Sequence, residues 1–297
     1  MIISDCVKVV KPPKKLTVSQ WADEYRQLSS EASAESGKWR TSRAEYQRGI
    51  MDAFSDPAID TVVWMSSAQV GKTEALLNIV GYFVDQDPSP MLLLQPTLDM
   101  AQAFSKDRLA PMTRDTKSLT YKIRDSKAKD SGNTILHKSF PGGHITMAGA
   151  NSPASLASRP VRVVLCDEVD RYPPSAGAEG DPVNLAFKRS TTFWNKKRML
   201  TSTPTIQGVS RIEAAYEESD KRKFYVPCYE CNHEQVLKWM NVSWDEDKPE
   251  TALYFCEKCG TSWSDAERWK AVSKGRWKAE KESNGVAGFW LNEIYSP

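Results

Sequence analysis

The stretch Thr61-Val-Val-Trp-Met-Ser-Ser-Ala-Gln-Val-Gly-Lys-Thr73 decides the fold. Its first five residues, Thr61 to Met65, are β-branched or apolar and predict a buried strand. Ser66 to Thr73 follow the pattern of a phosphate-binding loop, with Ser66 at the position of the first glycine. An apolar helical pattern follows from Ala75 to Val84. The sequence therefore predicts a strand, an anion-binding loop and a helix in direct succession.

This loop is a predicted ATP site. Its backbone N–H groups and the N-terminus of the following helix favour phosphate. We expect Lys72 to reach the β- and γ-phosphates and Thr73 to ligate Mg²⁺. The predicted nucleotide contacts are Ser66, Ser67, Ala68, Gln69, Val70, Gly71, Lys72, Thr73 and Glu74. An ordinary strand–turn–helix is the alternative.

A second strand, Val161 to Cys166, ends in two adjacent acids, Asp167 and Glu168. Carboxylates at the tip of a buried strand are costly unless they are used. We expect Asp167 to hold Mg²⁺ and Glu168 to polarise the attacking water as the catalytic base. A surface acid pair is the alternative.

Two weaker signals flank these motifs. Thr201, Ser202 and Thr203 end a predicted strand that begins at Arg198, and they are candidates for coupling hydrolysis to a neighbouring domain; a simple turn before Pro204 is the alternative. Tyr46 and Gln47 precede the first strand. They are candidates for stacking on adenine and reading its edge, with a core tyrosine as the alternative.

Further apolar runs alternate with helix-length segments, which indicates a parallel sheet covered on both faces. We predict strands at Met91–Leu94, Thr134–Leu136 and His144–Met147, and a helix at Leu98–Leu109. The predicted fold is α/β, a RecA-like P-loop NTPase of the additional-strand, catalytic-glutamate class. The sheet should be mainly parallel and flanked by helices, with a small zinc-ribbon-like subdomain.

That subdomain is predicted from Cys228-x2-Cys231 and Cys256-x2-Cys259. Such spacing in a chain without a secretory signal favours a closed structural Zn²⁺ site over disulfides. His233 is an alternative ligand. Nearby aromatic residues are expected to form a small core: Trp239, Trp244, Tyr254, Phe255 and Trp263.

Composition sets few limits. The chain has 297 residues and a net charge of +2, so bulk charge does not indicate a strongly basic nucleic-acid binder. No apolar run approaches the ~20 residues of a membrane span. Residues 1–40 are polar apart from an amphipathic stretch, Val18 to Leu28, which Ser19 is expected to cap.

Together these features resemble the large terminase subunit of lambda-like tailed bacteriophages. The resemblance rests on Trp21–Tyr25, Ser67–Glu74, Ser158–Arg162, Cys166–Pro173, Thr201–Pro204 and the paired cysteines. It implies an ATPase motor that moves double-stranded DNA into a procapsid in the host cytoplasm. The implied partners are the small terminase subunit, the portal protein and further copies of the chain in a ring, with no membrane.

The resemblance also implies a division of the chain. We expect an N-terminal arm that docks the small subunit at residues 1–40, the ATPase domain at 41–222, and a zinc-binding region with a linker at 223–297. A nuclease domain would follow in a longer protein. Some terminases carry an arginine inside the phosphate loop where this chain has Ala68. Arg159 and Arg162 are therefore candidate arginine fingers, with ion pairing beside the strand as the alternative.

Two other functions remain open on the sequence alone. One is a helicase-like ATPase, which should show a second RecA-like domain. The other is a zinc-containing DNA-binding adaptor with a vestigial nucleotide site.

Overall fold

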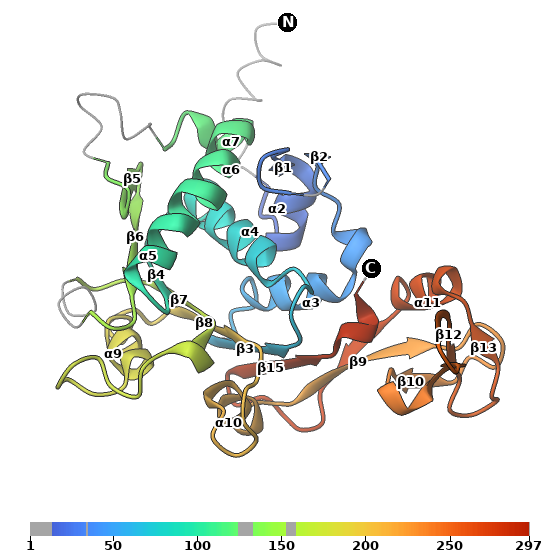
Figure 1. The fold of residues 1–297 in the computed structure, drawn as a ribbon. Helices are drawn as coiled ribbons and strands as arrows, with labels where there is room; N and C mark the ends of the chain where they lie inside the picture. The colour runs from blue at the N-terminus through green and yellow to red at the C-terminus, as the bar shows by residue number, and fades with distance from the viewer. Residues whose placement is uncertain (1–13, 34, 124–132, 153–158, 297) are drawn as a thin grey trace, which may run out of the picture.

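The computed structural model describes residues 14–33, 35–123, 133–152 and 159–296. At its centre is a sheet with the strand order β10-β9-β15-β3-β8-β7-β4-β6-β5, and β14 also pairs with β9 (Figure 1). The strands from β9 to β6 run parallel, whereas β5, β10 and β14 pair antiparallel. Their bounds are β3 Thr61–Ser66, β4 Pro90–Gln95, β5 His137–Phe140, β6 Gly143–Gly149, β7 Val163–Asp167, β8 Lys197–Ser202, β9 Arg222–Pro227, β10 Glu234–Val236, β14 Arg276–Lys278 and β15 Val286–Leu291.

The predicted parallel sheet is confirmed, with one strand misplaced. The expected strands β3, β4, β6, β7 and β8 all form, each with slightly shifted ends. Thr134–Leu136, however, is not a strand. The strand at this point is β5, which pairs with β6 across a turn at Pro141 and Gly142. The antiparallel register from this turn, and not the apolar pair Ile135-Leu136, sets where pairing occurs.

The helices cover both faces of the sheet (Figure 1). On one face lie α2 Val18–Tyr25, α3 Tyr46–Ala53, α4 Lys72–Asp85, α5 Leu98–Ala103, α6 Ala110–Asp115 and α7 Lys117–Thr120. On the other lie α9 Pro182–Lys188 and α10 Arg211–Glu218. Two 3-10 turns, η1 Thr41–Ala44 and η3 Val169–Arg171, connect these elements. The helix predicted at 98–109 changes to a π-helical turn, η2 Phe104–Leu109, before α6.

Alternate side chains of each central strand enter two separate apolar cores. In β7, Val163 and Leu165 pack under α4, while Val164 and Cys166 pack under α9 and α10. This alternation buries the strand on both faces, which explains why its sequence reads as a continuous apolar run.

The N-terminal segment packs into the same body as the central sheet and its helices. Thr17, and not the predicted Ser19, caps α2, because Thr17 forms a capping box with Gln20 while the Ser19 hydroxyl donates to Asp52. Trp21 is fully buried, packs on Gly81 of α4 and donates from Nε1 to Asp85 at 2.7 Å. The helix ends at Tyr25, so Leu28 lies outside it in β1 Gln27–Leu28, which pairs with β2 Gly37–Lys38.

The domain boundaries predicted from sequence therefore differ from the structure at both ends. The apolar face of α2 already packs on α4, so it is not free to dock a partner; residues 1–13 lie outside the described chain. At the other end, β9 and β15 extend the central sheet, and β15 pairs with β3 over its whole length. The segment 223–297 is thus not a separate region.

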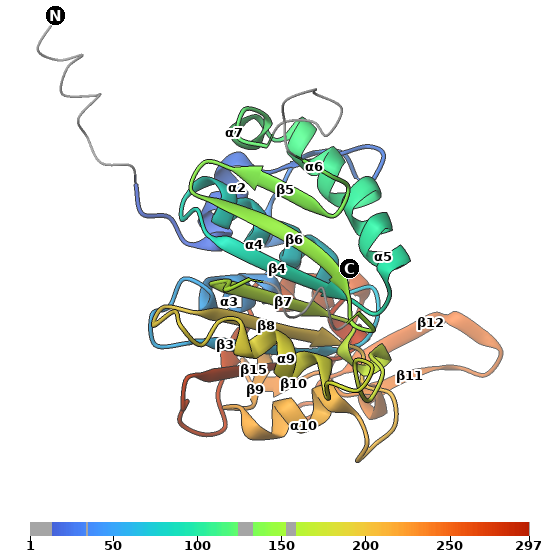
Figure 2. The same ribbon diagram turned by 90° about the vertical axis from the view of Figure 1, so that its left-hand side faces the viewer.

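A smaller unit is inserted between β9 and β15. It contains β10, η4 Trp239–Asn241, β11 Val242–Asp245, β12 Lys248–Phe255, β13 Ser262–Trp263 and α11 Asp265–Val272; a final turn, η5 Glu293–Tyr295, follows β15. The β11–β12 hairpin projects away from the body (Figure 2). Tyr254 and Trp263 are buried here, as expected, but Trp239 and Trp244 are exposed and lie against each other with ring centroids 6.1 Å apart. Among the described residues, none of the helices combines the length and apolar character that a membrane crossing requires.

The docking of α2 predicts a large loss of stability on Trp21→Ala. Because Trp21 is 0% exposed, its removal should lower the free energy of unfolding by about 3–5 kcal/mol. The matched control is Trp194→Ala, since Trp194 is 91% exposed and should change stability by less than about 0.5 kcal/mol. Urea denaturation followed by circular dichroism measures both. Equal stability of the two variants would show that α2 is not docked.

Candidate active site and zinc cluster

The phosphate loop joins β3 to α4 in the conformation that its sequence requires. Gln69 and Gly71 both have left-handed backbone angles, with φ of 61° and 82°. Gly71 is required for a second reason, because a Cβ atom there would collide with Nε2 of Gln47. The helix begins at Lys72, so its free N–H groups open toward the loop.

Tyr46 and Gln47 lie beside this loop, as expected, but they bind its backbone. The Tyr46 hydroxyl and Gln47 Nε2 both donate to the carbonyl oxygen of Val70, at 3.3 and 3.1 Å. Tyr46 is 1% exposed, its ring packs edge-on against Phe224, and burial raises its pKa to about 12. A ring that is 1% exposed belongs to the core, which favours the alternative of a core tyrosine over stacking on adenine.

Lys72 faces the acids at the tip of β7. Its Nζ donates to the Ser67 carbonyl at 2.9 Å and to Thr203 Oγ1 at 3.1 Å, and lies 4.0 Å from Glu168 Oε1. The side chain is 7% exposed. Burial lowers the pKa of Lys72, and the negative charges of Glu168 and Asp167 oppose that effect.

The two acids have different environments. Both oxygens of Asp167 accept hydrogen bonds, one from Thr201 Oγ1 at 2.6 Å and one from Gln95 Nε2 at 3.1 Å, which fixes the plane of its carboxylate. Glu168 is half-buried and has a left-handed φ of 54°. Such strain in a non-glycine residue is typical of active sites. Burial raises the pKa of Glu168, and nearby Lys72 lowers it in part.

The Thr201–Thr203 run lies at the centre of this arrangement. Thr201 donates to Asp167, and Thr203 Oγ1 accepts from Lys72. Ser202 Oγ accepts from the backbone N–H of Asp170 at 3.2 Å. The three hydroxyls therefore join the tip of β8 to Lys72, to Asp167 and to the turn that follows Glu168.

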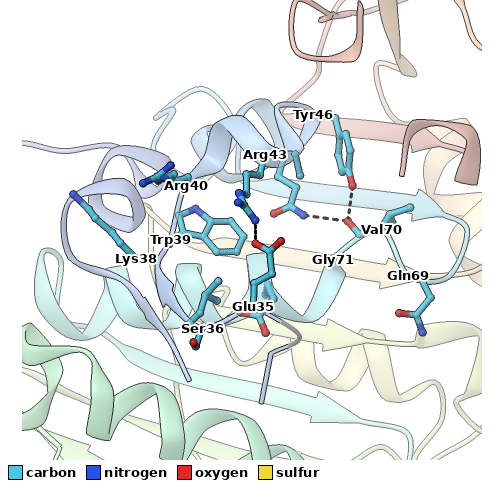
Figure 3. Close-up of a pocket in the computed structure, with 14 residues that line it drawn as sticks. Glu35, Ser36, Lys38, Trp39, Arg40, Arg43, Tyr46, Gln69, Val70 and Gly71 are labelled. Carbon is cyan, nitrogen blue, oxygen red and sulfur yellow. Dashed lines mark hydrogen bonds and ion pairs between the residues drawn. The ribbon is translucent and has the colours of Figure 1, made fainter. Parts of the chain in front are cut away.

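Two cavities adjoin the loop. One, of about 360 Å³, lies between Gln69–Gly71 and the N-terminal segment that carries Trp39 and Arg43 (Figure 3). The other, of about 700 Å³, is lined by Thr73, Gln95, Asp167, Glu168, Arg171, Asp107 and Arg108, together with residues 31–33. The N-terminal segment thus borders both cavities.

Sequence reasoning missed several of these residues. Gln95 carried a signal, because it is a polar residue at the end of an apolar strand. Arg26 carried no such signal. It is buried and lies 3.0 Å from Glu74, the residue that follows Thr73 of the phosphate loop, although Arg26 and Glu74 are distant in sequence. Glu74 lines the smaller cavity, and burial raises its pKa.

Arg162, one of the two candidate arginine fingers, is not near Lys72. Arg162 precedes β7, at the opposite end of the strand from Asp167, and pairs with Asp87 at 2.7 Å. Within this chain Arg162 therefore has the ion-pairing role given above as the alternative. Arg159 is exposed.

The residues present fit a nucleotide and Mg²⁺. Within the described chain, Ser66 Oγ, Ser67 Oγ and Gln47 Oε1 are buried at the loop without hydrogen-bond partners. Buried polar atoms without partners are costly, so they suit a polar ligand. Thr73 and Asp167 line the same cavity and offer the hard oxygen ligands that Mg²⁺ prefers.

The four cysteines converge in the smaller unit. Their Sγ atoms all lie within 4.8 Å of one another, with Cys228–Cys259 and Cys231–Cys256 both at 3.8 Å. A tetrahedral ion with 2.3 Å metal–sulfur bonds needs sulfurs about 3.8 Å apart. The set therefore fits Zn²⁺. His233 instead pairs through Nε2 with Glu257 at 3.1 Å.

A phosphate loop that faces two acids across a mixed, helix-flanked sheet is the arrangement of an α/β P-loop NTPase. The family model "Phage terminase large subunit gpA, ATPase domain" matches residues 33–277. The chain belongs to this family.

Individual relatives agree. The chain is 33% identical over 289 residues to a terminase large subunit of Enterobacteria phage P21, covering 95% of this chain and 44% of that protein. It is 30% identical over 253 residues to that of Escherichia phage lambda, covering 82% and 39%. The chain thus spans less than half the length of these relatives. The crystal structure of the HK97 bacteriophage large terminase shares the fold, with a TM-score of 0.53 and 11% identity over 68% of this chain and 41% of that one.

The sulfur geometry predicts about one zinc ion per purified chain, measured by elemental analysis. Cys259→Ser or a strong chelator should lower the melting temperature, because binding of the ion contributes to folding. Cys6→Ser is the control, since Cys6 is not one of the four. A folded, metal-free protein with an unchanged melting temperature would contradict the zinc site.

Proposed function

We propose that this domain hydrolyses ATP and that, in the full-length protein, hydrolysis drives double-stranded DNA into a procapsid. The single observation that carries the proposal is the approach of Lys72 Nζ to 4.0 Å from Glu168 Oε1. A cation for the phosphates and a carboxylate for the water then lie on either side of one reaction centre.

The residues divide the chemistry in the following way. Glu168 accepts a proton from water as the water oxygen bonds to the γ-phosphorus, and the bond from that phosphorus to the bridging oxygen breaks. Lys72 neutralises the phosphate oxygens, and the loop N–H groups hold the remaining phosphates. Mg²⁺, held by Thr73 and Asp167, would supply further positive charge. Gln47 and the cavity beside Trp39 are the proposed adenine subsite.

The strand order supports the RecA-like, additional-strand class. β8 lies between β3, which carries the phosphate loop, and β7, which carries the acids. Because Thr201–Thr203 end that intervening strand, we assign them the coupling role. The zinc ion is assigned a structural role, since four thiolates leave it no open position.

The partners come from family membership and belong to the same proposal. They are double-stranded DNA, the small terminase subunit, the portal protein and further copies of this chain in a ring, all acting in the host cytoplasm. Arg159 is exposed and remains a candidate for contacting the nucleotide of a neighbouring copy.

Lys72→Ala and Glu168→Gln should each lower the kcat of ATP hydrolysis by at least about 10²-fold, because each removes a charge at the reaction centre. Lys274→Ala and Glu282→Gln, at exposed positions, are the matched controls. Phosphate release is measured with and without linear duplex DNA. Full activity in both site variants would rule out this mechanism and favour the adaptor; separation of a partial duplex would favour the helicase-like reading.

The dependence of activity on pH follows from Glu168. Burial raises its pKa, so the carboxylate gains a proton, and the base is lost, as pH falls through a value above the usual ~4.3. We expect the acid limb of kcat/KM to lie above that value. Glu168→Asp should move this limb, whereas the titration of ATP itself is common to both enzymes. A limb that is identical in the two enzymes would show that another group controls it.

A further inference from the structure

Phosphoryl transfer gathers negative charge on the γ-phosphate, and one lysine rarely suffices to stabilise it. We propose that Arg171 is a catalytic residue that contacts the γ-phosphate from within the same chain. This inference rests on the proposed ATPase function and gives a role to an arginine of the Cys166–Pro173 motif that the sequence analysis left without one.

The position of Arg171 carries the argument. It ends η3, the short turn that begins directly after Glu168, and it lines the cavity that also contains Thr73 and Asp167. Its Nε lies 3.7 Å from Glu168 Oε2, while Lys72 Nζ lies 4.0 Å from Oε1 of the same carboxylate. Two cations therefore flank the predicted base, and both are within reach of a phosphate bound beside it.

The guanidinium group is available for a ligand. A separation of 3.7 Å is longer than a hydrogen bond, so the contact with Glu168 leaves the N–H donors of Arg171 free to bind phosphate. The side chain is 66% exposed and lines the cavity. Arginine suits this role because its planar fork matches two oxygens of a phosphate.

Hydrogen bonds hold the turn that ends at Arg171. The Asp170 carboxylate accepts from Thr205 N at 3.0 Å, from Thr205 Oγ1 at 3.1 Å and from Ile212 N at 2.8 Å. On the other side, Arg211 Nη1 donates to the Val169 carbonyl at 2.7 Å. A fixed backbone with a free side chain preorganises the charge at low entropic cost.

Three other arginines are occupied elsewhere. Arg108 lines the same cavity, but its Nη1 donates to the carbonyl oxygen of Ala32. Arg26 is buried against Glu74, and Arg162 pairs with Asp87 at the far end of β7. Among the described residues that line the cavity, Arg171 is thus the arginine best placed to reach a γ-phosphate.

The test compares Arg171→Gln and Arg171→Lys with Arg276→Gln. Arg276 is a matched control, because it is also 66% exposed and also pairs with a glutamate, Glu234, but in the sheet extension away from the cavity. Steady-state ATP hydrolysis is measured together with the affinities for ADP and for ADP with aluminium fluoride, which mimics the transferring phosphoryl group.

Arg171→Gln should lower kcat by about 10²-fold or more. It should also weaken binding of the aluminium fluoride complex while ADP affinity changes less than about twofold, since the residue contacts the transferring group. Arg171→Lys should recover part of kcat, because lysine keeps the positive charge but lacks the planar guanidinium group. Arg276→Gln should match the wild type.

Three results would overturn the inference. If Arg171→Gln keeps wild-type kcat while Lys72→Ala loses it, the proposed ATPase function stands and the role of Arg171 falls. An equal loss of affinity for ADP and for the fluoride complex would indicate a structural effect only. A wild-type protein that does not hydrolyse ATP, alone or with DNA, removes the proposed function and this inference with it.

Discussion

The structure depends on the register that places the phosphate loop opposite the acids of β7. Trp64 of β3 pairs with Thr201 of β8, and Thr201 pairs with Asp167 of β7, so three strand tips end at one level. Because side chains alternate across a strand, a slip of one residue in β7 would turn Asp167 and Glu168 to the opposite faces. The approach of Lys72 to Glu168 is therefore a property of the whole sheet and not of two local motifs.

Charged groups are buried at these strand ends. Burial of a charge is costly, and hydrogen bonds with neighbouring residues offset that cost. Asp167 is 6% exposed, yet both of its oxygens accept hydrogen bonds. Glu168 has a strained left-handed backbone, and the turn that follows it is tied by Asp170 to Thr205 and to the start of α10. These hydrogen bonds help to hold Glu168 in its strained conformation.

The sequence predicted the parts of the fold that are local. A buried strand, a phosphate loop and an amphipathic helix each leave a pattern within a dozen residues, and the four cysteines needed only their spacing. Contacts between distant segments left no such pattern. Nothing near Val286 indicates that β15 pairs along β3, or that Arg26 meets Glu74. Tyr46 shows the limit of residue chemistry: an aromatic next to an amide fits a base-stacking site, but packing against Phe224 decided its role.

The same long-range contacts connect the tip of β7 to the smaller unit that contains the four cysteines. Asp170 and Arg211 tie the turn after Glu168 to the start of α10. The chain leaves α10 and enters β9, which pairs with β15 and leads directly to Cys228. It returns from the smaller unit through β14, which pairs with β9, and then through β15 alongside β3. A rigid displacement of the β7 tip would have to move α10 or break these hydrogen bonds. Since α10 packs on β3 and β15 as well, the smaller unit is joined to the central sheet at both its entry and its exit.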